Sequence, residues 1–329
     1  MCNSKRNGCL DKMVIVIVLA ALLILAIAAV FFISWLLFCM ACSKKIPKII
    51  APLMNSLIGG FSLGELDMVV KGKAFYREEP SESWYTTSRD GLKLHAKYFP
   101  CEGARGTVIL FHGYRSSALH DFSGVLPYYN SLGLNILMCD HRAHGESEGK
   151  YITFGVLERF DVLSWVDEHN RRVGADVPVI LDGISMGGAT VAYAASEPLA
   201  ENVCGIMDDC GYTYPKDQIY YVMGLMKIPP FPFYHVADMF CRAFAKFSFS
   251  DVDARDTLSK TRIPCMFIHG EADDFVLCKM GIECHDACSS EKSIFLCPEA
   301  GHGMSYITQT DKCKEFLREF VDKVIPPKQ

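Results

Sequence analysis

The longest apolar stretch of the chain runs from Met13 to Cys42, and it contains no charged side chain over thirty residues. Ser34 is its only clearly polar residue. About twenty apolar residues are enough for a helix to cross the hydrocarbon core of a bilayer. We therefore predict a transmembrane helix over residues 13–42, preceded by a tail over residues 1–12. A cleaved signal peptide would have a shorter apolar core and a small-residue cleavage site, and neither feature fits this segment well.

Residues 43–74 have a different pattern and form the predicted juxtamembrane linker. Apolar side chains recur at roughly helical spacing between Ile46 and Val70, beside a basic cluster. This pattern suits a helix lying on the membrane surface, and equally a linker helix packed on the following domain. Basic residues flank the apolar span on both sides, so the charge pattern leaves the side of the membrane open. They are Lys5, Arg6 and Lys12 before the span, and Lys44, Lys45 and Lys48 after it.

Beyond residue 75, short apolar runs alternate with helical patterns. Runs without polar alternation are typical of strands buried on both faces, as in a parallel sheet. Asp90-Gly91 lies between two further β-rich runs, which predicts a hairpin at the start of the domain. The pattern therefore predicts an α/β domain over residues 75–329, with a mostly parallel central sheet flanked by helices. The apolar runs are 107–111, 135–139, 178–182, 203–207, 265–268 and 293–297.

The interval from Tyr212 to about Ser259 interrupts this alternation. It contains no predicted strand, but it is rich in aromatic residues and methionines. An insertion of this length within a regular α/β alternation is expected to fold as helices instead of a long loop. We therefore predict a short helical lid over residues 212–259.

Charge and cysteine content narrow the functional classes. The net charge of the 329-residue chain is −5, which gives no sign of a nucleic-acid surface. The fifteen cysteines are an odd number and most lie in apolar runs, so buried reduced thiols are expected. A loose cluster of Cys278, Cys284, His285 and Cys288 lacks the paired C-x-x-C spacing of zinc sites. We expect neither a metal nor another cofactor.

The segment that begins at Val179 carries the clearest chemical signal in the chain. A short apolar strand turns into a small-residue helix through the sequence Gly183-x-Ser185-x-Gly187. This spacing is that of a nucleophile elbow, in which the glycines leave room for a sharp turn and the serine is exposed at the end of the strand. The N–H of Met186, at the start of the helix, is placed to stabilise an oxyanion.

A serine nucleophile needs a base, and that base needs an orienting acid. Polar clusters follow the last two predicted strands. Residues 269–276 contain Asp273 and Asp274, and residues 298–303 contain His302. Open α/β sheets build their sites beyond the carboxyl ends of their strands, so both clusters are candidates for the site that contains the serine.

Taken together, these motifs resemble the α/β-hydrolase superfamily. Within it the chain is similar to the prolyl-oligopeptidase-like and serine-aminopeptidase-like branch of serine hydrolases. The resemblance covers about residues 80 to 325. The membrane segment lies outside it, so a shortened chain that begins near Phe75 is expected to be soluble and active. The motifs are His112-Gly113, Asp140-x-Arg142-x-His144-Gly145-x-Ser147, Gly183-x-Ser185-x-Gly187, His269-Gly270-x-x-Asp273-x-x-Val276 and Gly301-His302.

The resemblance implies a catalytic triad with Ser185 as nucleophile, Asp273 as orienting acid and His302 as base. Their order along the chain is the one that this fold uses. Asp274 is the rival for the acid, but it lies one place late in the motif.

The resemblance also implies an oxyanion hole formed by the backbone N–H groups of Tyr114 and Met186. The expected function is a membrane-anchored serine hydrolase that cleaves carboxylic esters with apolar acyl or aryl groups through an acyl-enzyme. A serine peptidase or aminopeptidase-like amidase is the first alternative, and a non-catalytic α/β-hydrolase binding protein is the second. The expected partners are a small ester or short peptide as substrate and the membrane through the N-terminal helix. The natural substrate and the oligomeric state stay open.

Overall fold

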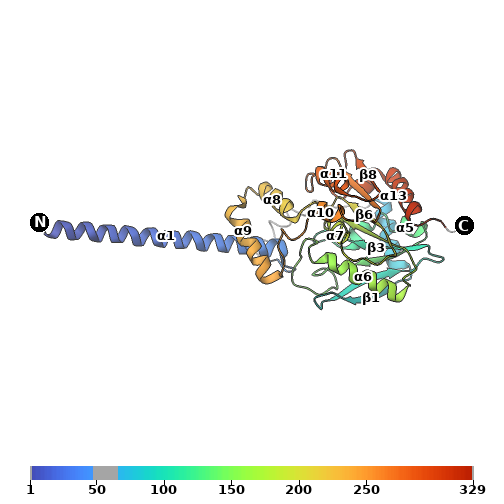
Figure 1. The fold of residues 1–329 in the computed structure, drawn as a ribbon, viewed down its shortest axis with the longest axis horizontal. Helices are drawn as coiled ribbons and strands as arrows, with labels where there is room; N and C mark the ends of the chain where they lie inside the picture. The colour runs from blue at the N-terminus through green and yellow to red at the C-terminus, as the bar shows by residue number, and fades with distance from the viewer. Residues whose placement is uncertain (1, 47–65, 328–329) are drawn as a thin grey trace.

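The computed structural model describes residues 2–46 and 66–327, and it is built around one eight-stranded sheet (Figure 1). The strands lie in the order β1-β2-β4-β3-β5-β6-β7-β8. Strand β2 is antiparallel to both of its neighbours, and the pairs from β4 to β8 are parallel. The sheet is therefore mostly parallel, as the apolar runs predicted. The strands are β1 (Glu82–Thr87), β2 (Lys93–Phe99), β3 (Gly106–Phe111), β4 (Leu134–Cys139), β5 (Val179–Ile184), β6 (Val203–Asp209), β7 (Cys265–Gly270) and β8 (Lys292–Cys297).

Successive side chains of the strands face two different apolar layers. In β3, Ile109 and Phe111 belong to one cluster of buried residues, and Val108 and Leu110 belong to the other. This alternation is the period of two that strand geometry imposes. Helices cover both layers, so both faces of the sheet are removed from water. The first layer includes α6 (Glu158–Arg172), α7 (Met186–Ala194) and α11 (Cys278–Ala287), and the second includes α4 (Ala118–Phe122), α5 (Leu126–Ser131), α12 (Ser305–Thr308) and α13 (Thr310–Val324).

The insertion between β6 and β7 is helical, as the sequence predicted. Its last helix, α10 (Ala254–Leu258), packs on α7 and α11 and so belongs to the layer beside the sheet. The other three elements extend away from the sheet toward the N-terminal helix (Figure 1). We call them the lid helices: α8 (Pro215–Leu225), α9 (Pro230–Phe240) and the π-helix η1 (Cys241–Ala245).

The N-terminal helix α1 (Cys2–Cys42) projects away from the sheet over most of its length (Figure 1). Its segment over residues 13–42 is apolar and long enough to cross a membrane. The last turns of the helix, in contrast, enter the domain. Phe38 is only 1% exposed, and its ring contacts the rings of Tyr151, Phe240 and Phe244.

The chain directly after α1 is also bonded to the domain through its backbone. The N–H of Ile152 donates to the carbonyl of Cys42 at 2.7 Å, and the N–H of Lys44 donates to the carbonyl of Lys150 at 2.9 Å. The sequence predicted an anchor separable from the domain. In the structure, Phe38 in the last turns of α1 is buried against the lid helices, so the end of the helix packs within the domain.

The predicted linker over residues 43–74 lies largely outside the described residues, which omit 47–65. The same holds for most of the predicted helix over Ile46–Val70. Helix α3 (Asp67–Glu78) contains the predicted domain boundary at residue 75 and packs on α4 and α5. The layer of helices over the sheet therefore begins before that boundary.

Candidate active site

Ser185 lies at a sharp turn between β5 and α7. Its backbone has φ 57° and ψ −114°, a conformation that residues with a side chain rarely adopt. Two close approaches explain the glycines around it. A Cβ atom at Gly183 would clash with the carbonyl oxygen of Gly187, and one at Gly187 would clash with that of Phe111. The turn therefore has no room for a side chain at either glycine position.

The structure brings Ser185, His302 and Asp273 together at the carboxyl edge of the sheet. The Nε2 atom of His302 is 2.8 Å from the Oγ of Ser185, and its Nδ1 is 2.7 Å from Oδ2 of Asp273. Asp273 follows β7 and His302 follows β8, so parallel neighbouring strands deliver both side chains to the same edge. The imidazole can thus accept the serine proton at Nε2 while the carboxylate holds Nδ1–H.

Asp273 is buried and held as a carboxylate. Burial alone would raise its pKa, but hydrogen bonds from His269 and His302 hold the pKa well below its ordinary value. The backbone N–H groups of Phe275 and Val276 also donate to its Oδ1, at 3.0 and 2.9 Å. The rival Asp274 is exposed at the surface. Of the two acids, the structure therefore places Asp273 on the imidazole.

The candidate oxyanion donors lie on either side of Ser185. Met186 is the first residue of α7, and N–H groups in the first turn of a helix have no partner within the helix. Tyr114 follows β3 and lines the same cavities as Ser185. Its neighbour Gly113 packs so closely that a Cβ atom there would be 3.4 Å from the Cβ of Ser185.

Two side chains fix the loop that carries Tyr114. The N–H of Gly113 donates to Oδ2 of Asp121 at 2.7 Å, and the N–H of Arg115 donates to Nε2 of His144 at 3.1 Å. The sequence motif contains His144 but predicts no contact with this loop, and sequence reasoning missed Asp121 altogether. A single acid in a short helix carries no sequence signal for this role, because its partner is a backbone N–H eight residues away.

His144 can accept this bond because it is neutral. Burial lowers its pKa to about 3, with a further contribution from the nearby His112. Nδ1 then carries the proton and donates to the carbonyl of Arg142 at 3.0 Å, which leaves Nε2 as the acceptor. The guanidinium of Arg142 pairs with Asp161 and Asp90. Arg142 and His144 therefore lie in one hydrogen-bonded turn, and this turn holds the loop after β3 through the bond from the Arg115 N–H to His144.

Two cavities of different polarity meet at Ser185. The first is an open cleft with polar side chains in its lining, including Arg115 of the loop after β3 and His120 of α4, and it is also lined by the loop after β8. The second is an apolar pocket between α1, α8 and the domain. Tyr114, Ser185 and Phe275 line both cavities. A bound molecule can therefore have a polar part and an apolar part on opposite sides of the serine.

Three side chains of metal-ligating type approach one another in the described residues: Cys210, Asp273 and His302. Asp273 and His302 are hydrogen-bonded to each other, and burial raises the pKa of Cys210 well above its ordinary value. A thiol that stays protonated is a poor metal ligand, because metals bind the thiolate. We therefore interpret this group as part of the acid–base arrangement.

Comparison with known proteins agrees with this fold. The family model described as "Serine aminopeptidase, S33" matches residues 102–212, a range that contains Ser185. Protein YqkD of Bacillus subtilis is 24% identical over 66% of this chain and 72% of its own length. A monoacylglycerol lipase of Mycolicibacterium smegmatis is 35% identical over 30% of this chain and 36% of its own length. The esterase PF2001 of Pyrococcus furiosus superposes with a TM-score of 0.64 at 22% identity, over 80% of this chain and 96% of that structure.

Proposed function

Because this chain belongs to the α/β-hydrolase superfamily, we propose that it is a membrane-anchored serine hydrolase that cleaves carboxylic esters. The observation that carries the proposal is the hydrogen-bonded series from Asp273 through His302 to Ser185, at the wall of an apolar pocket. The preferred substrates have apolar acyl or aryl groups.

The reaction passes through an acyl-enzyme. The Oγ of Ser185 attacks the ester carbonyl carbon while Nε2 of His302 takes the hydroxyl proton, and the N–H groups of Tyr114 and Met186 stabilise the oxyanion. When the ester bond breaks, His302 gives the proton to the leaving alkoxide. Water then attacks the acyl group with the same base, and the free acid and Ser185 are regenerated.

The lining of the apolar pocket favours esters over charged peptides. Burying an unpaired charge in such a pocket is costly, whereas each buried methylene contributes about 0.8 kcal/mol. The matched family model is described as a serine aminopeptidase, and this match supports a peptidase as the second candidate. The two candidates differ in the bond that they cleave, an ester or an amide, and in the acyl part that they accept.

A panel of substrates separates the candidates. Full-length protein in detergent would be assayed with p-nitrophenyl esters of increasing acyl length and with aminoacyl p-nitroanilides. We expect kcat/KM to rise over the first few carbons, the charged anilides to be poor substrates, and Ser185→Ala to lower ester turnover by at least about 10⁴-fold. A flat ester series with efficient anilide cleavage would establish the peptidase instead. Undiminished turnover by the Ser185→Ala variant would refute both.

A further inference from the structure

The apolar pocket beside Ser185 has one wall made by the predicted membrane helix. Met40 and Ala41 of α1 face Ile219 and Val222 of α8 across it. Its cavity volume is about 80 Å³. Residues of the hydrolase domain and of the predicted anchor thus share one pocket at the nucleophile.

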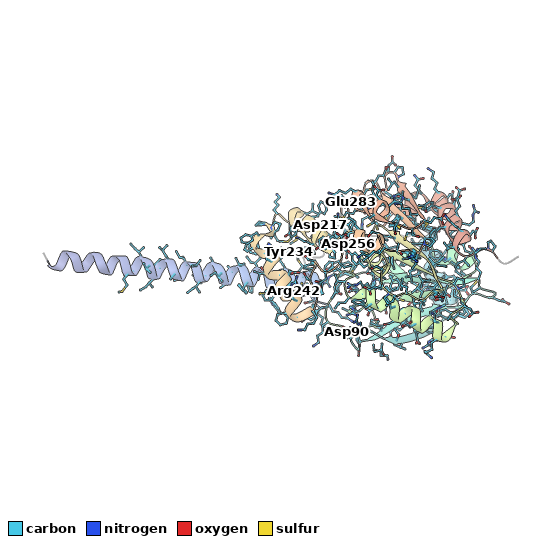
Figure 2. The ribbon with its side chains drawn as sticks, in the orientation of Figure 1. Asp90, Asp217, Tyr234, Arg242, Asp256 and Glu283 are labelled. Carbon is cyan, nitrogen blue, oxygen red and sulfur yellow. The ribbon has the colours of Figure 1, made fainter. Side chains whose placement is uncertain are left out.

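The pocket continues along α1, away from Ser185. A second apolar cavity of about 60 Å³ shares Met40, Ala41, Ile219 and Val222 with the first. It adds Leu37, about one helical turn closer to the exposed part of α1. Its far side is lined by Met226, directly after α8, and by Tyr234 of α9, which Figure 2 labels beside the base of α1. The two cavities are therefore adjacent, and together they follow an apolar seam between α1 and the lid helices.

The far end of this seam lies among exposed apolar side chains. On α1, Phe31, Phe32 and Trp35 are exposed before the helix enters the domain. On the lid helices, Phe231 is 76% exposed, and Leu225, Met239 and Phe244 are also exposed. The lid helices lie beside the base of α1, where the chain leaves the domain (Figure 1). An exposed apolar patch next to a predicted membrane helix marks a surface that contacts lipid.

The end of α1 is hydrogen-bonded to the loop after β3, which carries Tyr114 and Arg115. The hydroxyl of Tyr114 donates to the carbonyl of Ala41 at 2.7 Å, and the guanidinium of Arg115 donates to the carbonyls of Met40 and Ser43 at 2.9 and 2.7 Å. The same loop supplies the candidate oxyanion donor of Tyr114. A displacement of α1 would therefore move both the α1 side of the apolar pocket and the loop that carries the backbone N–H of Tyr114.

We propose that α1 is part of the substrate site: the acyl chain of a single-chain lipid ester lies along α1 and enters from the bilayer between α1 and the lid helices. This inference rests on the proposed esterase function. The ester carbonyl lies at Ser185, the acyl chain extends past Ala41 and Val222 toward Leu37, and the polar alcohol occupies the cleft beside Arg115. The anchor then has a second role, because its last turns line the acyl site and affect which chain lengths bind.

Two blocking variants test the wall in the full-length protein. Ala41→Phe and Val222→Phe place a ring where the two cavities join, and Ala243→Phe makes the same change as Ala41→Phe at an exposed position of η1. Each buried methylene contributes about fourfold to affinity. We expect both blocking variants to lower the ratio of kcat/KM for dodecanoyl to acetyl p-nitrophenyl ester by at least about tenfold, with the ratio unchanged in Ala243→Phe. Labelling of Ser185 by a fluorophosphonate reports whether each variant is folded. A ratio within twofold of wild type in labelled blocking variants would overturn the proposal.

A second measurement uses the wild-type chain and so does not depend on a variant that folds. A decyl fluorophosphonate with a diazirine at the chain end would be attached to Ser185 and then photolysed. We expect crosslinks in peptides of α1 or of the lid helices, and mass spectrometry would locate them. Crosslinks confined to the loop at residues 115–120 would contradict the proposal, because the chain would then occupy the polar cleft. Failure of the wild type to react at Ser185 and to cleave any ester would instead refute the proposed function, and this inference with it.

Discussion

The strain at Ser185 is held in place by its surroundings. A residue with a side chain at φ 57° and ψ −114° costs on the order of 1–3 kcal/mol, and such strain persists where the structure over-determines it. Here the N–H of Ser185 donates to the carbonyl of Asp209 at 2.8 Å, and the glycines pack against neighbouring backbone. As a result, the hydroxyl is presented to His302 instead of turning into the core.

At the residue scale, the two adjacent acids give a matched test. Asp273→Asn leaves an amide that no longer favours the imidazole tautomer with the proton on Nδ1, so we expect kcat to fall about 10³–10⁴-fold. Asp274→Asn changes an exposed side chain and keeps the backbone carbonyl that accepts from the Tyr221 hydroxyl, so we expect kcat within about twofold of wild type. Ester hydrolysis by the two purified variants measures both values. A larger loss in Asp274→Asn would reverse the assignment of the acid.

A buried acid below the elbow predicts a pH dependence of stability. Burial raises the pKa of Asp182 to about 8, although the Tyr129 hydroxyl donates to it at 2.6 Å. Between its ordinary value of 3.8 and about 8, the unfolded chain ionises this group while the native state keeps it protonated. The free energy of unfolding therefore falls as pH rises through that window.

Asp182→Asn removes this titration, so stability should depend less on pH between 5 and 8. Asp208 and Asp209, whose pKa values burial raises to about 6 and about 7, leave part of the slope in the variant. Thermal unfolding midpoints in detergent at several pH values would measure it. Equal slopes for wild type and variant would show that Asp182 does not carry the effect.

At the element scale, the sequence predicted the parts of the fold that local pattern determines. The uninterrupted apolar strands, the elbow at Ser185 and the order of the triad are visible in the residues themselves. The burial of Phe38 is not, because residues 13–42 are apolar on all sides and nothing distinguishes a turn that faces lipid from one that faces protein. Asp121 was missed for a related reason, since its function depends on the position of Gly113 in the folded chain.

Two phenylalanines of α1 test whether its end belongs to the domain. Phe38 is 1% exposed, whereas Phe32 is 62% exposed in the described structure. Phe38→Ala should lower the free energy of unfolding by about 3–5 kcal/mol, because it opens a cavity among aromatic rings. Phe32→Ala should have little effect on the unfolding of the domain. Thermal unfolding of both full-length variants in detergent provides the comparison, and equal midpoints would place the end of α1 outside the cooperative unit.

At the scale of the whole molecule, the candidate catalytic edge and the predicted anchor lie together. Met40 and Ala41 line the pocket at Ser185, while the apolar side chains between Met13 and Ile33 are largely exposed. The rest of the domain consists of the sheet and the helices that cover its two apolar faces. This arrangement places the candidate nucleophile near the membrane surface if α1 spans a bilayer.

The same arrangement predicts integral membrane attachment. Full-length protein should stay in the pellet when membranes are washed with alkaline carbonate, because an apolar helix of this length is stable in the hydrocarbon core. A peripheral protein released by the same wash serves as the control. Recovery of the full-length chain in the supernatant would contradict a membrane-spanning α1.

The identity of the nucleophile is the central claim, and covalent labelling tests it most directly. Full-length protein would be treated with an alkyl fluorophosphonate, and peptide mapping would locate the modification. We predict one phosphonyl group on Ser185, no labelling of Ser185→Ala, and wild-type labelling of Ser131→Ala, in which an exposed serine is removed. Stoichiometric labelling at another serine, or equal labelling of the Ser185→Ala variant, would contradict the account.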